Sequence, residues 1–179
     1  MEIINENVDI PLSNFDILDL MNNKANIVLY PNLHQYKSID ELLGRYGVAF
    51  ILFESQPKYG HWTLLFKLNN QCLEFFNPYG GIKKGFPDEP LNFIPKDFAK
   101  KSNQDIPYLS LLMIESPYKL SYNEFNLQEH NPNIKTCGRH CCVRLACRQL
   151  NLYQYKDFMK TLCKELEMNP DQLVTLFTI

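Results

Sequence analysis

The sequence predicts a single α+β domain spanning residues 1–179, with a central, mostly antiparallel sheet packed against helices. Three observations predict it. Segments suited to strands gather between residues 48 and 77 and are joined by short turns, whereas helical apolar spacing precedes and follows them. Neither a repeat nor a low-complexity tract divides the chain, whose length suits one domain.

The first third of the chain predicts two helices around a strand. Ser13 or Asn14 can cap a helix over residues 15–21, and residues 25–30 form a strand that Pro31 ends. Ser38 with Glu41 three residues later is a capping box. It predicts a helix over residues 39–46 that Gly47 stops.

Three strands follow, joined by short turns. Residues 48–54 are a nearly continuous apolar run, as expected of a strand covered on both faces. Residues 61–68 and 71–77 form the next two strands, with Asn69 and Asn70 in the turn between them. Such short connections predict an antiparallel meander.

The remaining chain is mainly helical. Residues 81–90 are a loop rich in breakers, residues 106–115 are ambiguous but favour a helix, and residues 118–128 are irregular with a short strand. Other helices are predicted over residues 95–101, 136–151, 153–167 and 170–177, the last with Asn169 as cap and Pro170 in its first position.

Composition excludes several classes. Hydrophobic residues at 45% and aromatic residues at 13% exclude a disordered chain, and a formal charge of −2 provides no global reason to bind nucleic acid. The pairs Lys83, Lys84 and Lys100, Lys101 are better interpreted as solvated faces than as binding patches. The acidic N-terminus resembles no signal peptide, and no apolar run is long enough to span a bilayer, so we expect no membrane association.

The cysteines indicate a reducing compartment. Four of the six, Cys137, Cys141, Cys142 and Cys147, crowd into eleven residues of one predicted helix, where good disulfide geometry is out of reach. A zinc site built from Cys137, His140 and Cys141 is disfavoured because no second pair of ligands follows at zinc spacing. We expect neither a metal nor a cofactor.

Cys137 is the candidate nucleophile. It opens the predicted helix behind Thr136, a plausible N-cap, where unpaired backbone N–H groups and the helix dipole favour a thiolate. The simpler interpretation is a small buried hydrophobic residue.

A cysteine nucleophile needs an imidazole within reach and a third group behind it. Of four histidines, His34 and His130 lie in loops, and His140 shares the helix with Cys137, which leaves little room for substrate between them. His61, at the start of a predicted strand, is the better base. A strand-end histidine with only a structural role is the alternative.

Asn77 and Gln128 complete the candidate site. Antiparallel pairing would bring the end of one strand, at Asn77, beside the start of the other, at His61, where the amide can orient the imidazole. Gln128 lies nine residues before Cys137 and can aim its amide at a developing oxyanion, together with the Cys137 N–H. A turn asparagine and a surface glutamine are the alternatives.

The ordered segments GHWTLLF, EFFNPYGG, LQ and TCGRHCC resemble a superfamily of cysteine proteases. It includes adenain, the adenovirus maturation protease, and the SUMO- and NEDD8-specific deconjugating proteases. The resemblance covers residues 48–150 and implies a papain-like, adenain-like fold that hydrolyses a peptide or isopeptide bond, often after glycine. It assigns His61 as base, Cys137 as nucleophile and Gln128 as oxyanion residue. Asn77 stands where the family has Asp or Glu.

The resemblance also implies that Trp62 walls a narrow groove admitting glycine. Among family branches, the compact size and the CGRH segment are most similar to capsid-maturation proteases of virophages and related DNA viruses. The expected substrate is then a viral structural precursor, in the host cytoplasm or the virion. A ubiquitin-like-protein deconjugating enzyme and an inert scaffold stay as alternatives, and activation by DNA or a peptide is left open.

Overall fold

One mixed sheet of five strands lies at the centre of residues 1–81 and 86–179, the part of the chain that the computed structural model describes. In spatial order the strands are β1 (Asn26–Leu29), β2 (Val48–Gln56), β3 (Tyr59–Lys67), β4 (Cys72–Phe76) and β5 (Lys119–Tyr122). Strands β2, β3 and β4 form the predicted antiparallel meander, whereas β1 and β5 pair in parallel with β2 and β4. The sheet is therefore mixed rather than mostly antiparallel, because helical crossovers lead out of β1 and into β5.

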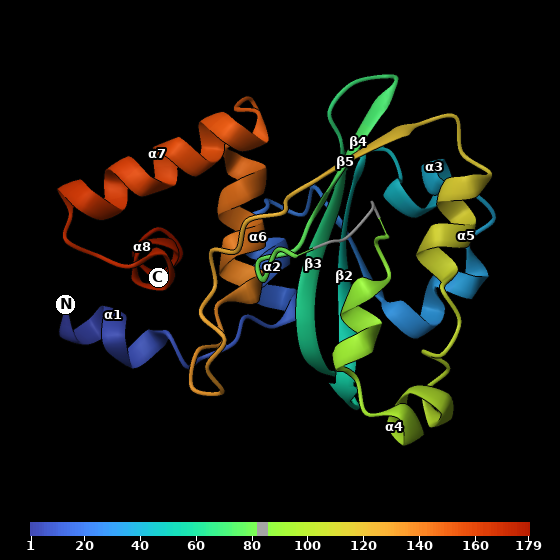
Figure 1. The fold of residues 1–179 in the computed structure, drawn as a ribbon, viewed down its shortest axis with the longest axis horizontal. Helices are drawn as coiled ribbons and strands as arrows, with labels where there is room; N and C mark the ends of the chain where they lie inside the picture. The colour runs from blue at the N-terminus through green and yellow to red at the C-terminus, as the bar shows by residue number, and fades with distance from the viewer. Residues whose placement is uncertain (82–85) are drawn as a thin grey trace.

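Helices cover both faces of the sheet (Figure 1). One face packs against α2 (Asn14–Leu20), α6 (Cys137–Ala146), α7 (Leu152–Glu165) and α8 (Pro170–Leu176), and α1 (Glu2–Asn7) contacts α8. The other face packs against η1 (Tyr30–Gln35), α3 (Ile39–Leu43), η2 (Glu89–Phe93), α4 (Lys96–Lys101) and α5 (Tyr108–Ile114). Successive side chains of β2 point to opposite faces of the sheet. Phe50 and Leu52 belong to the core on the α6 side, and Ile51 and Phe53 belong to the core on the α3 side. The predicted α+β class is confirmed.

Several boundaries differ from the predictions. Helix α3 ends at Leu43 rather than near Gly47, because Gly44 takes a positive φ of 62° as its C-cap. Helix α6 ends at Ala146, short of the predicted 151. The short elements α1, η1 and η2 were not predicted, and η2 begins inside the predicted 81–90 loop. Lys83 and Lys84 of that loop lie outside the described residues.

A buried ion pair fixes α6 to the sheet. Arg144 of α6 is fully buried and donates to both carboxylate oxygens of Glu74 on β4, at 2.7 and 3.0 Å. Its guanidinium also donates to the carbonyl oxygens of Cys147 and Leu150, at 2.8 Å each, just beyond the helix. Because such a forked pair is geometrically demanding, it fixes the distance between the helix and β4.

No helix in the described ranges is both long enough and apolar enough to cross a membrane.

Candidate active site

The first turn of α6 lies against an unpaired stretch of β3. Pairing between β3 and β4 begins only at Leu64 and Phe76, so the backbone of Trp62 has no β4 partner. The Trp62 N–H donates to Cys137 Sγ at 3.4 Å, and the Cys141 thiol donates to the Trp62 carbonyl at 3.6 Å. The thiols of the first two turns of α6 thus supply the hydrogen-bond partners that β4 does not offer to Trp62. These bonds hold the Cys137 sulfur beside β3.

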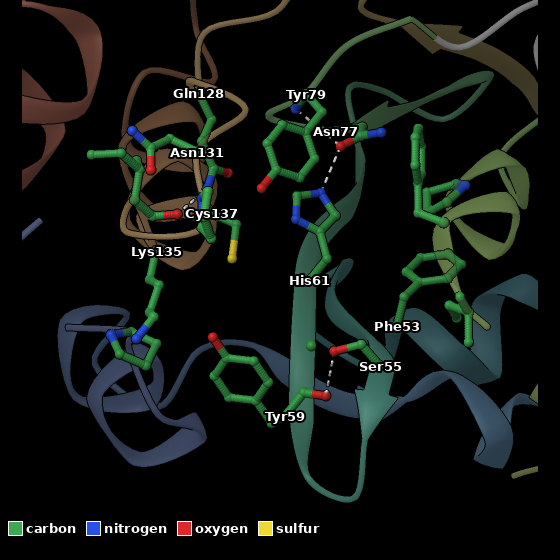
Figure 2. Close-up of a pocket in the computed structure, with 17 residues that line it drawn as sticks. Phe53, Ser55, Tyr59, His61, Asn77, Tyr79, Gln128, Asn131, Lys135 and Cys137 are labelled. Carbon is green, nitrogen blue, oxygen red and sulfur yellow. Dashed lines mark hydrogen bonds between the residues drawn. The ribbon is translucent and has the colours of Figure 1, made fainter. Parts of the chain in front are cut away.

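The end of β4 brings His61 and Asn77 together. Pro78 ends the strand because it lacks an N–H, and Asn77 precedes it. Asn77 Oδ1 lies 2.7 Å from His61 Nε2 and also accepts the Tyr79 backbone N–H at 3.1 Å. Since the Tyr79 amide can only donate, Asn77 presents its oxygen, and His61 Nε2 therefore carries a hydrogen. The lone pair is then on Nδ1, on the side of the ring that faces Cys137 in Figure 2.

His61 and Cys137 line one cavity of about 210 Å³. Figure 2 shows the imidazole on one wall and the sulfur on the other. Asn77 and Gln128 line the same cavity. The structure thus brings the four predicted catalytic residues to one pocket, although β3 already begins at Tyr59, two residues before His61.

Gln128 is buried with its backbone N–H bonded to the Pro78 carbonyl at 3.1 Å. Its Nε2 donates to the Ile134 carbonyl at 3.3 Å, which leaves the second amide hydrogen available. Its Oε1 has no hydrogen-bond partner within the described ranges. These bonds hold Gln128 between the turn at Pro78 and the loop before α6. It therefore lies in the wall of the cavity that Cys137 also lines, rather than on the surface.

Trp62 is buried and lines a second cavity of about 670 Å³ rather than the first. Its indole N–H donates to the Leu12 carbonyl at 3.1 Å, so the segment before α2 covers it. The two cavities share Pro11, Tyr59 and Gly60. Trp62 therefore lines the neighbouring cavity, and its contact with a substrate stays a prediction.

An aromatic stack that the sequence analysis missed flanks the imidazole. The Tyr79 ring lies on His61 with centroids 4.4 Å apart and on His130 with centroids 4.2 Å apart, at 16° and 19° between planes. Figure 2 shows the Tyr79 hydroxyl on the Cys137 side of the pocket. His130, which the sequence places in a loop, thus stacks on the other face of Tyr79 from His61. The sequence held one indication of this role, because Tyr79 lies in the NPYGG segment directly after the candidate residue Asn77.

Two buried side chains behind the site were also missed. Asn123 accepts the Asn77 N–H at 2.9 Å and donates to the Asn77 carbonyl at 2.7 Å, which extends the β4–β5 pairing by one residue. Asp171 of α8 accepts from the Thr136 hydroxyl, from His140 Nε2 at 2.9 Å and from the Glu129 N–H at 3.0 Å. Thr136 is the N-cap residue of α6, as predicted, but its hydroxyl donates to Asp171 and makes no capping bond to the helix.

His140 is completely buried outside the cavity lining, and its Nε2 donates to Asp171 at 2.9 Å. Nowhere in residues 1–81 and 86–179 do three His, Cys, Asp or Glu side chains gather so as to hold a metal ion.

Comparison with known proteins identifies one relative. The chain is 48% identical over 170 residues to a protein of Sputnik virophage described as "Uncharacterized protein V9", and the alignment covers 95% of each chain. The chain belongs to the V9 family. No protein-family model and no solved structure matches it. A virophage relative agrees with the viral origin that the resemblance implied.

The electrostatics of this V9-family site differ from the prediction in one respect. Burial raises the pKa of the Cys137 thiol above its ordinary value, although hydrogen bonds from the backbone N–H groups of Trp62 and Gly138 oppose the shift. The helix start therefore does not produce a thiolate in the free protein. Burial also lowers the pKa of His61 to about 4, against the opposing hydrogen bond with Asn77. At neutral pH the site holds a thiol and a neutral imidazole.

This arrangement suits proton transfer during attack rather than a preformed ion pair. A neutral imidazole with its lone pair on Nδ1 is a base, and Asn77 keeps it in that tautomer. A buried thiol next to a base can lose its proton as the sulfur forms a bond to carbon. The first turn of α6 adds the Cys137 backbone N–H as a donor for a developing oxyanion.

Proposed function

We propose that this V9-family protein is a cysteine peptidase of an adenain-like fold that cleaves a viral structural precursor near glycine. The observation that carries the proposal is the single cavity shared by Cys137, His61, Asn77 and Gln128, together with the 2.7 Å contact between His61 and Asn77. The mixed sheet with the cysteine-bearing helix on one face is compatible with such a fold.

The reaction follows from these positions. The Cys137 sulfur bonds to the scissile carbonyl carbon while its proton passes to His61 Nδ1. The Cys137 N–H and the Gln128 amide bind the oxyanion. His61 then returns the proton to the leaving amine as the carbon–nitrogen bond breaks, and water hydrolyses the thioester with His61 again as base.

The two adjacent cavities, which share lining residues, support a polypeptide substrate. A chain bound across Cys137 can continue past the shared residues Pro11, Tyr59 and Gly60 into the cavity that Trp62 lines. Gly60 lies so close to β2 that a Cβ there would come within 1.9 Å of the Phe53 carbonyl oxygen. Only glycine therefore fits at this point of the β2–β3 pair, which lines both cavities.

Mass spectrometry of cleavage products tests the proposal. The protein is incubated with a mixture of virophage capsid proteins, with a ubiquitin-type fusion, and with short peptides that contain glycine. We expect defined new termini next to glycine in a capsid protein, and none with Cys137→Ala. Cleavage of the ubiquitin-type fusion alone would instead indicate a deconjugating enzyme. Absence of cleavage in every arm would overturn the proposal.

A non-catalytic scaffold is the second candidate. The raised pKa of the Cys137 thiol and the neutral Asn77 favour it over an ion-pair enzyme. Such a scaffold would bind the same polypeptides with equal affinity before and after Cys137→Ala and would leave them intact.

A further inference from the structure

We propose that Asp171, on the C-terminal helix α8, is a positioning residue that sets the separation of the two oxyanion donors. The inference rests on the proposed function. Asp171 lies 35 residues after Thr136 in the chain and is buried, with 2% of its surface exposed. It belongs to neither wall of the cavity and acts through its neighbours.

One carboxylate holds both segments that supply those donors. Its Oδ1 accepts the Thr136 hydroxyl, one residue before Cys137. Its Oδ2 accepts the Glu129 N–H at 3.0 Å, one residue after Gln128. Each of the two donor residues, Cys137 and Gln128, is thus the chain neighbour of a residue that is hydrogen-bonded to one oxygen of the same carboxylate.

The carboxylate is itself firmly held. Burial alone would raise the pKa of Asp171, but hydrogen bonds with His140, Thr136 and the Glu129 N–H outweigh it and keep the pKa below its ordinary value. His140 reaches Oδ1 at 2.9 Å, and the Thr175 hydroxyl binds the Asp171 carbonyl at 2.7 Å. An ionised acceptor with three donors is a rigid reference point.

Besides Asp171, the segment that carries Gln128 is held by the Leu127 and Gln128 N–H bonds to the Pro78 carbonyl and by the Gln128 Nε2 bond to the Ile134 carbonyl. It lies between β5 and α6 without regular structure, and Gln128 Oε1 has no partner within the described ranges. An oxyanion donor must lie within a few tenths of an ångström of its working position to contribute. Loss of the Asp171 contacts would leave the sulfur in place, because Trp62 and Cys141 hold the first turns of α6 on β3.

This separation of roles makes a sharp test. Alkylation of Cys137 by iodoacetamide forms no oxyanion, whereas hydrolysis of a glycine ester or peptide does. Asp171→Asn replaces one accepting oxygen by an amide that cannot receive the Glu129 N–H or the Thr136 hydroxyl. Thr136→Val removes one donor, and Thr136→Ser keeps it. Asp157→Asn, an exposed carboxylate on α7, is the matched control.

With Asp171→Asn we expect kcat to fall by about 10- to 100-fold, as on the loss of an oxyanion donor, while KM and the alkylation rate stay within about threefold. Thr136→Val should show a smaller loss of the same kind, Thr136→Ser should recover it, and Asp157→Asn should match the native protein. Circular dichroism and thermal melting establish that each variant folds. If Asp171→Asn does not fold, the comparison of Thr136→Val with Thr136→Ser tests the inference instead.

An unchanged kcat in Asp171→Asn would overturn the inference, as would equal loss of hydrolysis and alkylation, because that pattern indicates general loosening. If the two Thr136 variants have to decide, an unchanged kcat in Thr136→Val would overturn the inference. Failure of the proposed function looks different, since the native protein itself would then hydrolyse no substrate.

Discussion

His61 Nε2 and Asn77 Oδ1 lie 2.7 Å apart, and this contact assigns the hydrogens of the imidazole. The same oxygen accepts the Tyr79 N–H, so the amide cannot turn over without losing both bonds. In the proposed mechanism a neutral side chain performs the orienting part of a carboxylate's work in a triad, while it adds no charge to stabilise an imidazolium.

Replacing Asn77 separates orientation from charge. Asn77→Ala removes the acceptor for the Nε2 hydrogen, and kcat should fall on the order of 100-fold or more because the wrong tautomer becomes available. Asn77→Asp keeps the acceptor and adds a negative charge, which raises the pKa of His61. The measurement is the pH dependence of hydrolysis, in which the acidic limb of Asn77→Asp should lie at higher pH. Full activity of Asn77→Ala would contradict the orienting role.

The native pH profile follows from the shifts at the same two side chains. Hydrolysis needs neutral His61, and burial lowers its pKa to about 4, so activity should persist as pH falls through 6.5 and be lost only as it approaches 4. Because the pKa of the Cys137 thiol is raised, alkylation by iodoacetamide should keep accelerating above pH 9. An acidic limb near 6.5, with alkylation that reaches a plateau by neutral pH, would indicate a preformed ion pair instead.

Tyr79 should act through its ring. Its stack with His61, at 4.4 Å between centroids, restricts the imidazole to one orientation. Stacked pairs contribute about 0.5–1.5 kcal/mol beyond burial, so Tyr79→Leu should lower kcat about 2- to 10-fold, and Tyr79→Phe should retain it. Steady-state kinetics of both variants provide the check. An equal loss in Tyr79→Phe would show that the hydroxyl, on the Cys137 side of the pocket in Figure 2, is the active part.

The buried Arg144–Glu74 pair predicts a large effect on stability. Arg144→Met leaves Glu74 buried without its partner, which should cost about 3–5 kcal/mol in the free energy of unfolding by urea. The double variant Glu74→Leu with Arg144→Met removes both charges and should recover part of that loss. A single variant as stable as the native protein would show that the pair is not needed to hold α6 against β4.

Local patterns predicted the parts of the site that depend on strand order. The apolar runs and turns of residues 48–77 predict three antiparallel strands, and the pairing of these strands predicts that His61 lies near Asn77, as the structure shows. The mixed character of the sheet was missed because β1 and β5 are only four residues each and depend on their neighbours for pairing.

Long-range contacts of single polar side chains were beyond the sequence. Asn123 meets Asn77 across 46 residues and Arg144 meets Glu74 across 70. Their nearby partners are backbone carbonyls, of Phe125, Cys147 and Leu150, which any residue type offers and which therefore leave no sequence pattern. The state of the Cys137 thiol was misjudged for a related reason. A helix start favours the thiolate locally, but the packing of α6 on β3 buries the sulfur, and burial has the larger effect on the pKa.

Covalent labelling tests the central claim, that Cys137 and His61 form a reactive pair facing a polypeptide groove. The native protein is treated at neutral pH with a short peptide ending in a glycine vinyl methyl ester, and the adduct is located by mass spectrometry. We predict one adduct, on Cys137, that is lost in Cys137→Ala and at least about 100-fold slower in His61→Gln, since removal of a catalytic base costs on that order. No adduct, or labelling spread over the partly exposed Cys72, Cys147 and Cys163, would contradict the account.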